Sequence, residues 1–177
     1  LFINLQAFSI LLFGTSIAAL KLWSAIFGTM TVLGAYLLAK ELWQKRGVAL
    51  FSAFLVASSY WAINFSRIGF RAIMVPCVLL FSFYFVFRGL RTKNLLSFFV
   101  GGLIFGLGFH TYIAFRIAPA ILVILAIGGY FSYKNFFALF WRHAVAFAIG
   151  AAITLAPMIA TFAMHPEYLS SRSASIS

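Results

Sequence analysis

The residues Ala72–Leu90, AIMVPCVLLFSFYFVFRGL, decide the class of fold. They form a continuous apolar run with a single charge, Arg88, and apolar residues do not alternate with polar ones. As a helix the run would be about 28 Å long, close to the ~30 Å hydrocarbon thickness of a bilayer. A membrane-spanning β-strand would instead alternate apolar and polar residues. The run therefore predicts a membrane-spanning helix.

Similar runs occur on both sides of this one, so the prediction extends along the chain. Residues 1–13 are apolar but short and interrupted by polar side chains, which is typical of an interfacial helix. The chain is predicted to be an all-α polytopic membrane protein, with a transmembrane domain over residues 1–164 and the start of an external loop over 165–177. The six predicted spans are about 22–42, 48–65, 72–90, 95–113, 117–133 and 144–163.

The composition agrees with a chain whose solvent is a bilayer. Of the 177 residues, 64% are hydrophobic and 8% are charged, with a mean hydropathy of +1.08. Such a chain could not hide its apolar surface as a soluble domain, and it is no disordered tail or disulfide-rich module. The net charge of +11 is scattered between apolar runs, so no nucleic-acid partner is predicted.

The Lys and Arg residues predict the orientation of the chain. Six spans place the connecting segments alternately on two sides, and the side richer in Lys and Arg is predicted to be cytoplasmic. One side carries eight: Lys40, Lys45, Arg46, Arg88, Arg91, Lys93, Lys134 and Arg142. The other, external side carries five: Lys21, Arg67, Arg71, Arg116 and Arg172. Charges that remain at the membrane edge against this rule are candidates for function.

Glycines within one run predict how its helix packs. Gly102 and Gly106 form a small-xxx-small pattern that lets another helix approach closely, and Gly101 and Gly108 extend it. Their spacing does not match a nucleotide-binding fingerprint, because the pattern lies within a span.

The first candidate site is the external turn Phe65–Arg71, FSRIGFR. Arg67 and Arg71 would share one face at the start of a helix, about 6 Å apart. Two cations so placed repel each other unless an anion lies between them, and a phosphate matches the guanidinium fork. The alternative is that both side chains extend to lipid headgroups.

The next external turn, His110–Arg116, supplies a second group of candidates. Arg116 again places a cation at the external end of a span. His110 could be a general base, a metal ligand or a hydrogen-bonding residue. Tyr112 could stack on a sugar or belong to the aromatic belt at the membrane surface.

The polar tail after residue 164 supplies the third group. Glu167 is the only acid predicted on the external side, and with His165 it could bind a divalent metal or a sugar hydroxyl. Arg172 adds another cation, and a solvated loop is the alternative. Together the three turns suit an anionic lipid headgroup, such as a polyprenyl-phosphate or a polyprenyl-phosphate-linked sugar. A polyprenyl-phosphate or anion transporter and a non-catalytic membrane scaffold are alternative functions.

Several stretches of the sequence resemble a known family. Lys21–Thr31 (KLWSAIFGTMT), running into Gly34–Leu42 (GAYLLAKEL), is similar to the second span of glycosyltransferase family 39. This family has the GT-C fold and includes relatives of the protein O-mannosyltransferases and the lipid A aminoarabinose transferases. Leu1–Gly14 resembles the juxtamembrane helix before that span. Asn64–Val75 (NFSRIGFRAIMV) resembles the family's external turn, and His165–Arg172 (HPEYLSSR) a later loop.

The resemblance implies a mechanism and a set of partners. A polyprenyl-phosphate-linked sugar enters from the bilayer, an acceptor hydroxyl attacks the anomeric carbon on the external side, and polyprenyl phosphate leaves. Arg67, Arg71 and Arg116 would bind the donor phosphate. The setting would be the plasma membrane of a prokaryote, with the site facing away from the cytoplasm.

One departure from the family pattern concerns the general base. The family uses an Asp in the first external loop, whereas this chain contains no Asp. We expect that Asp to lie before Leu1, so that the chain alone is inactive. The chain, which starts at Leu1 rather than Met and stops within its pattern at Ser177, is expected to be a fragment truncated at both ends. Ser66 and Arg67 stand where some relatives carry an acid, which puts a metal requirement in doubt.

Overall fold

The computed structural model describes residues 2–132 and 136–164. Within them, every regular element is helical, and none is a strand. The all-α prediction is therefore confirmed. The elements are α1 (Phe2–Phe13), α2 (Ile17–Trp43), α3 (Arg46–Ala57), α4 (Tyr60–Ile68), the 3₁₀ helix η1 (Arg71–Ile73), α5 (Met74–Thr92), α6 (Leu95–Gly108), the 3₁₀ helix η2 (Ile113–Ile117), α7 (Ala118–Ser132) and α8 (Phe136–Met164).

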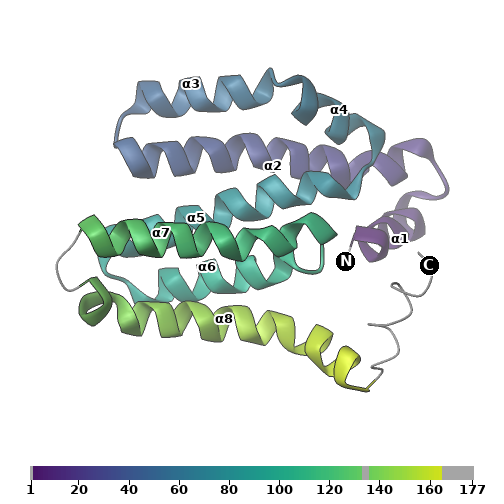
Figure 1. Ribbon diagram of the computed structural model, residues 1–177. Helices are drawn as coiled ribbons and strands as arrows, with labels where there is room; N and C mark the ends of the chain where they lie inside the picture. The colour runs from purple at the N-terminus through teal and green to yellow at the C-terminus, as the bar shows by residue number, and fades with distance from the viewer. Residues whose placement is uncertain (1, 133–135, 165–177) are drawn as a thin grey trace, which may run out of the picture.

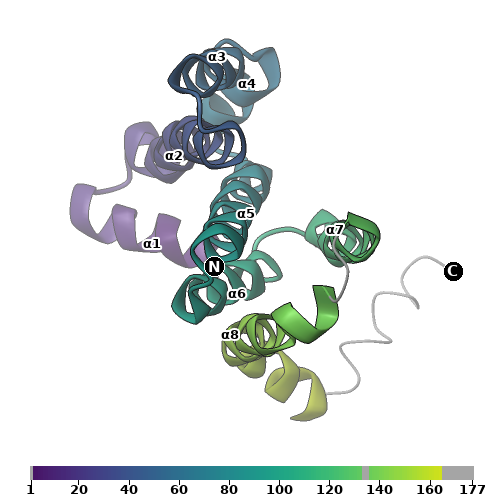
Figure 2. The same cartoon turned by 90° about the vertical axis from the view of Figure 1, so that its left-hand side faces the viewer.

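The long helices lie side by side, and successive ones run in opposite directions across the view of Figure 1. Seen from the turned view, α2, α5, α6 and α8 follow one another, each packed against the next (Figure 2). The helices α1, α3 and α4 pack on α2, whereas α7 stands to one side and contacts mainly η2 and α8. The alternation gathers the helix termini at two ends of the molecule.

The two ends of the molecule differ in which helix termini they hold. The Glu41 end holds the C-termini of α2 and α5 with the N-termini of α3 and α6 (Figure 1). The Arg71 end holds the N-terminus of α2, together with α4, η1 and η2. These are the two groups of connecting segments that charge counting separates into cytoplasmic and external.

Four of the described helices are long and apolar enough to cross a membrane, and the bent pair α3–α4 could supply a fifth span. This supports a polytopic membrane protein. The run predicted over 95–113 contains the shorter helix α6, which has 14 residues and ends at Gly108. Thr111 ends this segment in a turn, since its hydroxyl donates to the carbonyl of Gly108 over 2.6 Å. The division into six spans stays a prediction.

The continuous helix expected over 48–65 is broken in the structure. The helices α3 and α4 meet at an angle of 54° around two serines. The hydroxyl of Ser58 donates to the carbonyls of Phe54 and Leu55, over 2.8 and 3.3 Å, while Ser59 has an extended backbone. Serine side chains compete with the helical ladder in this way, which explains the break.

The close-packing prediction for the glycines of α6 is confirmed. A Cβ at Gly102 would meet the backbone of Phe147 on α8, and one at Gly106 would meet Thr154 and Ala151. Seen from α8, a Cβ at Gly150 would meet the backbone of α6. The absence of side chains therefore lets the two helices touch along their backbones.

Candidate functional site

The sequence-predicted site residues lie at the Arg71 end. Arg67 is in the last turn of α4, and Arg71 opens η1; both are exposed. Between them Gly69 adopts a left-handed backbone with φ of 82°, and Phe70 is extended. The expectation that Arg67 and Arg71 share one helical face is therefore wrong. Glycine tolerates this conformation and ends α4, so the two arginines extend from different elements.

The structure joins the two predicted turns through an aromatic contact. The guanidinium carbon of Arg71 lies 5.6 Å from the centre of the Tyr112 ring. The ring of Phe70 meets the same tyrosine edge-on, with centroids 5.9 Å apart. A cation over an aromatic face is attracted by the ring quadrupole, which holds Arg71 between the two turns. Arg71 and Tyr112, which are 41 positions apart in the chain, thus belong to one group.

Further aromatic rings continue this group along α4. Phe65 lies 5.6 Å from Phe70, and Trp61 lies 5.5 Å from Phe65, measured between ring centroids. Trp61 is 67% exposed. The series places flat, largely apolar faces beside the cations, which is the composition of an interfacial aromatic belt.

Lys21 is a further cation at this end, and it was not among the predicted site residues. It is exposed on the second turn of α2, and its side chain lies alongside Gly69, where an added Cβ would be 3.7 Å from its Cγ. The missed signal is local spacing: Lys21 lies one turn before Ala25, on the face of α2 that meets α4. The Arg71 end thus carries a cation from α2 as well as from α4 and η1.

His110 links the turn after α6 to α8. Its Nε2 atom lies 2.8 Å from the carbonyl oxygen of Thr154. Pro157 lies within α8 three residues further on, where its missing N–H disturbs the helical ladder. The structure therefore gives His110 a hydrogen bond between helices. Its suggested role as a substrate contact or metal ligand stays a prediction. Arg116 is exposed on η2, beside the buried Phe115.

The charges of the described residues are distributed unequally between the two ends. The chain has two acids, and Glu41 is the one that the structure describes. At the Glu41 end its carboxylate accepts from Arg91 Nε, and from Arg91 Nη2 over 3.2 Å. Among residues 2–132 and 136–164, no carboxylate reaches Arg67 or Arg71. Among the described residues these cations therefore lack an acid partner, which suits this end to binding an anion.

Three predicted contacts lie outside the described residues: His165, Glu167 and Arg172. The described part of the chain holds no group of three His, Cys, Asp or Glu side chains that could bind a metal. A divalent metal at His165 and Glu167 therefore stays a prediction.

The fold and this end together define a polytopic helical membrane protein with a cationic, aromatic-lined edge. Comparison with protein-family models then identifies the family of the chain. The model of the dolichyl-phosphate-mannose-protein mannosyltransferase family matches residues 1–164, and the chain belongs to this family. Membership makes it a membrane glycosyltransferase by type and confirms the resemblance drawn from Lys21–Leu42. No curated protein and no solved structure matched the chain.

Proposed function

We propose that the protein transfers a sugar from a polyprenyl-phosphate-linked donor to an acceptor hydroxyl, on the extracytoplasmic face of a prokaryotic plasma membrane. One observation carries the proposal: Arg71 lies over the Tyr112 ring and joins two turns whose cations have no acid partner in the described chain. The family supports sugar transfer, and this group of residues supports an anionic donor.

The chemistry requires a cation where the leaving group forms. The acceptor oxygen bonds to the anomeric carbon of the sugar, while the bond from that carbon to the phosphate oxygen breaks. The electron pair of the broken bond stays on polyprenyl phosphate, which gains negative charge. Arg67 and Arg71 can stabilise this charge by charge-assisted hydrogen bonds, and Arg116 is the third residue proposed to do so. The acceptor hydroxyl loses a proton to a base that we do not assign, since the chain contains no Asp.

The aromatic contacts give the arginine a defined position. Arg71 is exposed, and an exposed arginine otherwise samples many side-chain conformations. The Tyr112 ring restricts the guanidinium, while the Phe70 contact holds the tyrosine in turn. A guanidinium that is already placed loses less entropy when a phosphate binds.

The test uses a matched pair of arginines. Arg88 lies over Tyr84 at 5.8 Å and donates to its hydroxyl over 2.6 Å, but α5 places it at the Glu41 end. Arg71→Ala and Arg88→Ala therefore remove the same kind of contact from opposite ends. In nanodiscs, Arg71→Ala should weaken binding of undecaprenyl phosphate by about 10–150-fold, as expected for ~1.5–3 kcal/mol. Arg88→Ala should leave binding unchanged, and equal effects of the two variants would refute the assignment.

The proposed side has its own test. Cys77 is buried, so a cysteine introduced by Arg67→Cys or Arg88→Cys would be the accessible thiol of the described residues. A membrane-impermeant maleimide should label the Arg67→Cys protein in intact cells and the Arg88→Cys protein only after permeabilisation. The reverse pattern would contradict the proposed orientation.

A further inference from the structure

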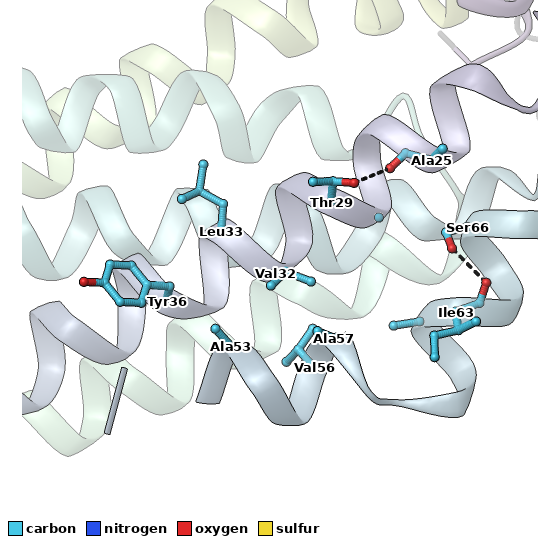
Figure 3. A pocket seen from close by; sticks show the side chains of 12 residues that line it. Ala25, Thr29, Val32, Leu33, Tyr36, Ala53, Val56, Ala57, Ile63 and Ser66 are labelled. Carbon is cyan, nitrogen blue, oxygen red and sulfur yellow. Dashed lines mark hydrogen bonds between the residues drawn. The ribbon is translucent and has the colours of Figure 1, made fainter. Parts of the chain in front are cut away.

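A groove runs along α2, between it and the bent pair α3–α4. Its volume is about 530 Å³, within the ~300–1,000 Å³ typical of small-molecule sites. All three helices contribute to its walls (Figure 3). Its lining includes Ala25, Thr29 and Tyr36 of α2, Ala53 and Ala57 of α3, and Ser66 of α4.

The groove follows from the break between α3 and α4 and from small side chains. The 54° bend turns α4 relative to α3, so the pair does not follow α2 as one straight helix would. At one place α2 and α4 do touch, because a Cβ at Gly28 would lie 2.7 Å from that of Ser66. Ala53 and Ala57 line the groove on α3, and their short side chains leave space in it (Figure 3).

The walls of the groove offer apolar surface to an occupant. The hydroxyl of Thr29 donates to the carbonyl of Ala25 over 2.9 Å, and that of Ser66 to Ile63 over 2.7 Å (Figure 3). Thr29 and Ser66 are thus satisfied by their own helices, and Tyr36 is the further lining residue with a hydroxyl. A sugar or peptide would find few partners here, whereas a hydrocarbon chain needs none.

The groove leads to the cations of the Arg71 end. On α2 its lining residues follow helical spacing through Tyr36, Val32, Thr29 and Ala25, and the next position on this face is Lys21. On α4 the lining ends at Ser66, which directly precedes Arg67. The side chain of Lys21 also lies alongside Gly69, and Gly69 stands between Arg67 and Arg71 in the sequence. The groove therefore has cations at both ends. At the Arg71 end these are Lys21 and Arg67, and at the other end Lys40, whose Nζ lies 5.7 Å from the centre of the Tyr36 ring, stands next to the acid Glu41 in sequence.

We propose that this groove holds the hydrocarbon tail of a polyprenyl phosphate, and that Lys21 contacts its phosphate together with Arg67. The inference rests on the proposed function and assigns the lipid part of the same donor. A phospholipid carries two chains beneath its phosphate, whereas a polyprenyl phosphate carries one. One groove beginning beside the cations matches the single chain. The charge of the phosphate complements Lys21, for which the described residues supply no acid.

The test separates the tail from the phosphate. The probes are undecaprenyl phosphate, farnesyl phosphate with its shorter tail, and phosphatidic acid, each bound to the full chain in phosphatidylcholine nanodiscs. Ala57→Phe and Ala53→Phe fill the groove from α3 (Figure 3). Ala148→Phe adds the same bulk to an exposed position on α8, away from the groove, and serves as the control. Thermal stability compared with that control identifies a variant that fails to fold, and the second filling variant then replaces it.

The native protein should bind undecaprenyl phosphate at least about tenfold more tightly than farnesyl phosphate, since the longer tail buries more hydrocarbon in the groove. Filling the groove should remove this difference and leave farnesyl phosphate binding unchanged. Lys21→Ala should weaken both probes about tenfold, and Lys21→Arg should restore them. Equal affinity for the two tail lengths, or groove filling that weakens phosphatidic acid equally, would overturn the tail site. If Arg71→Ala did not weaken undecaprenyl phosphate binding, the proposed function would be overturned instead.

Discussion

The α6–α8 contact gives the sharpest test of how this fold is held together. Gly102→Ala adds one methyl group where the backbone of Phe147 leaves no room, since the new Cβ would lie within 3.0 Å of the Phe147 Cα. The obstacle is main chain, so a side-chain rotation cannot relieve it. Gly128 on α7 is the matched control, because a Cβ there would have nothing within 4 Å.

The expected magnitude follows from two opposing terms. Alanine improves helix propensity over glycine by about 1 kcal/mol, and this gain applies at both positions. Overpacking costs about 1–3 kcal/mol and applies at Gly102 alone. The free energy of unfolding of Gly102→Ala should therefore fall about 1–3 kcal/mol below that of Gly128→Ala. At ~2–4 °C per kcal/mol for a chain of this length, the difference in Tm is about 2–12 °C.

The assay is thermal unfolding of the purified protein in one detergent, followed by loss of the monodisperse peak in size-exclusion chromatography. Gly128→Ala should have a Tm equal to or slightly above that of the native protein. If Gly102→Ala and Gly128→Ala unfold at the same temperature, α6 and α8 are not in backbone contact. The packing described here would then be refuted.

Two other substitutions test polar contacts between α5 and its neighbours. Ser82→Ala removes a buried hydroxyl that donates to the carbonyl of Gly101 over 3.0 Å, and should lower the free energy of unfolding by about 0.5–1.5 kcal/mol. Thr92→Val, whose exposed hydroxyl bonds only within its own helix, should change the same Tm less. Glu41→Gln breaks the ion pair with Arg91; the Glu41 side chain is 9% exposed, but that of Arg91 is 54% exposed and solvent screens the pair, so the loss in Tm should be small. Measured at low and high salt, a loss that does not shrink with added salt would contradict this interpretation.

Much of the fold could be predicted because a bilayer imposes simple rules on a chain. Apolar runs such as Ala72–Leu90 must satisfy their backbone internally, so helix follows from hydropathy alone. The glycine spacing of α6 likewise predicted a close helix contact. Neither rule detects the break at Ser58–Ser59, because serine is common within membrane helices and its effect depends on which carbonyl the hydroxyl reaches.

The candidate site was predictable only in part, for a reason of distance along the chain. The unusual cations identified Arg67, Arg71 and the turn of Tyr112 as separate groups. The contact between Arg71 and Tyr112 depends on how α6 packs against α5 and α8, and no local sequence pattern predicts that packing. The left-handed Gly69 was also decisive, since a helical continuation would have placed Arg71 elsewhere. Lys21 was overlooked because orientation already accounted for its charge.

The short helix α6 has a consequence for the bilayer itself. Its 14 residues rise about 21 Å, less than the ~30 Å of hydrocarbon beside it. A helix this short, facing lipid alone, would thin the membrane, but α5 and α8 flank this one. The end of α6 is also covered by side chains, since the buried ring of Phe115 lies against Gly108, so this end of the short helix faces protein rather than lipid.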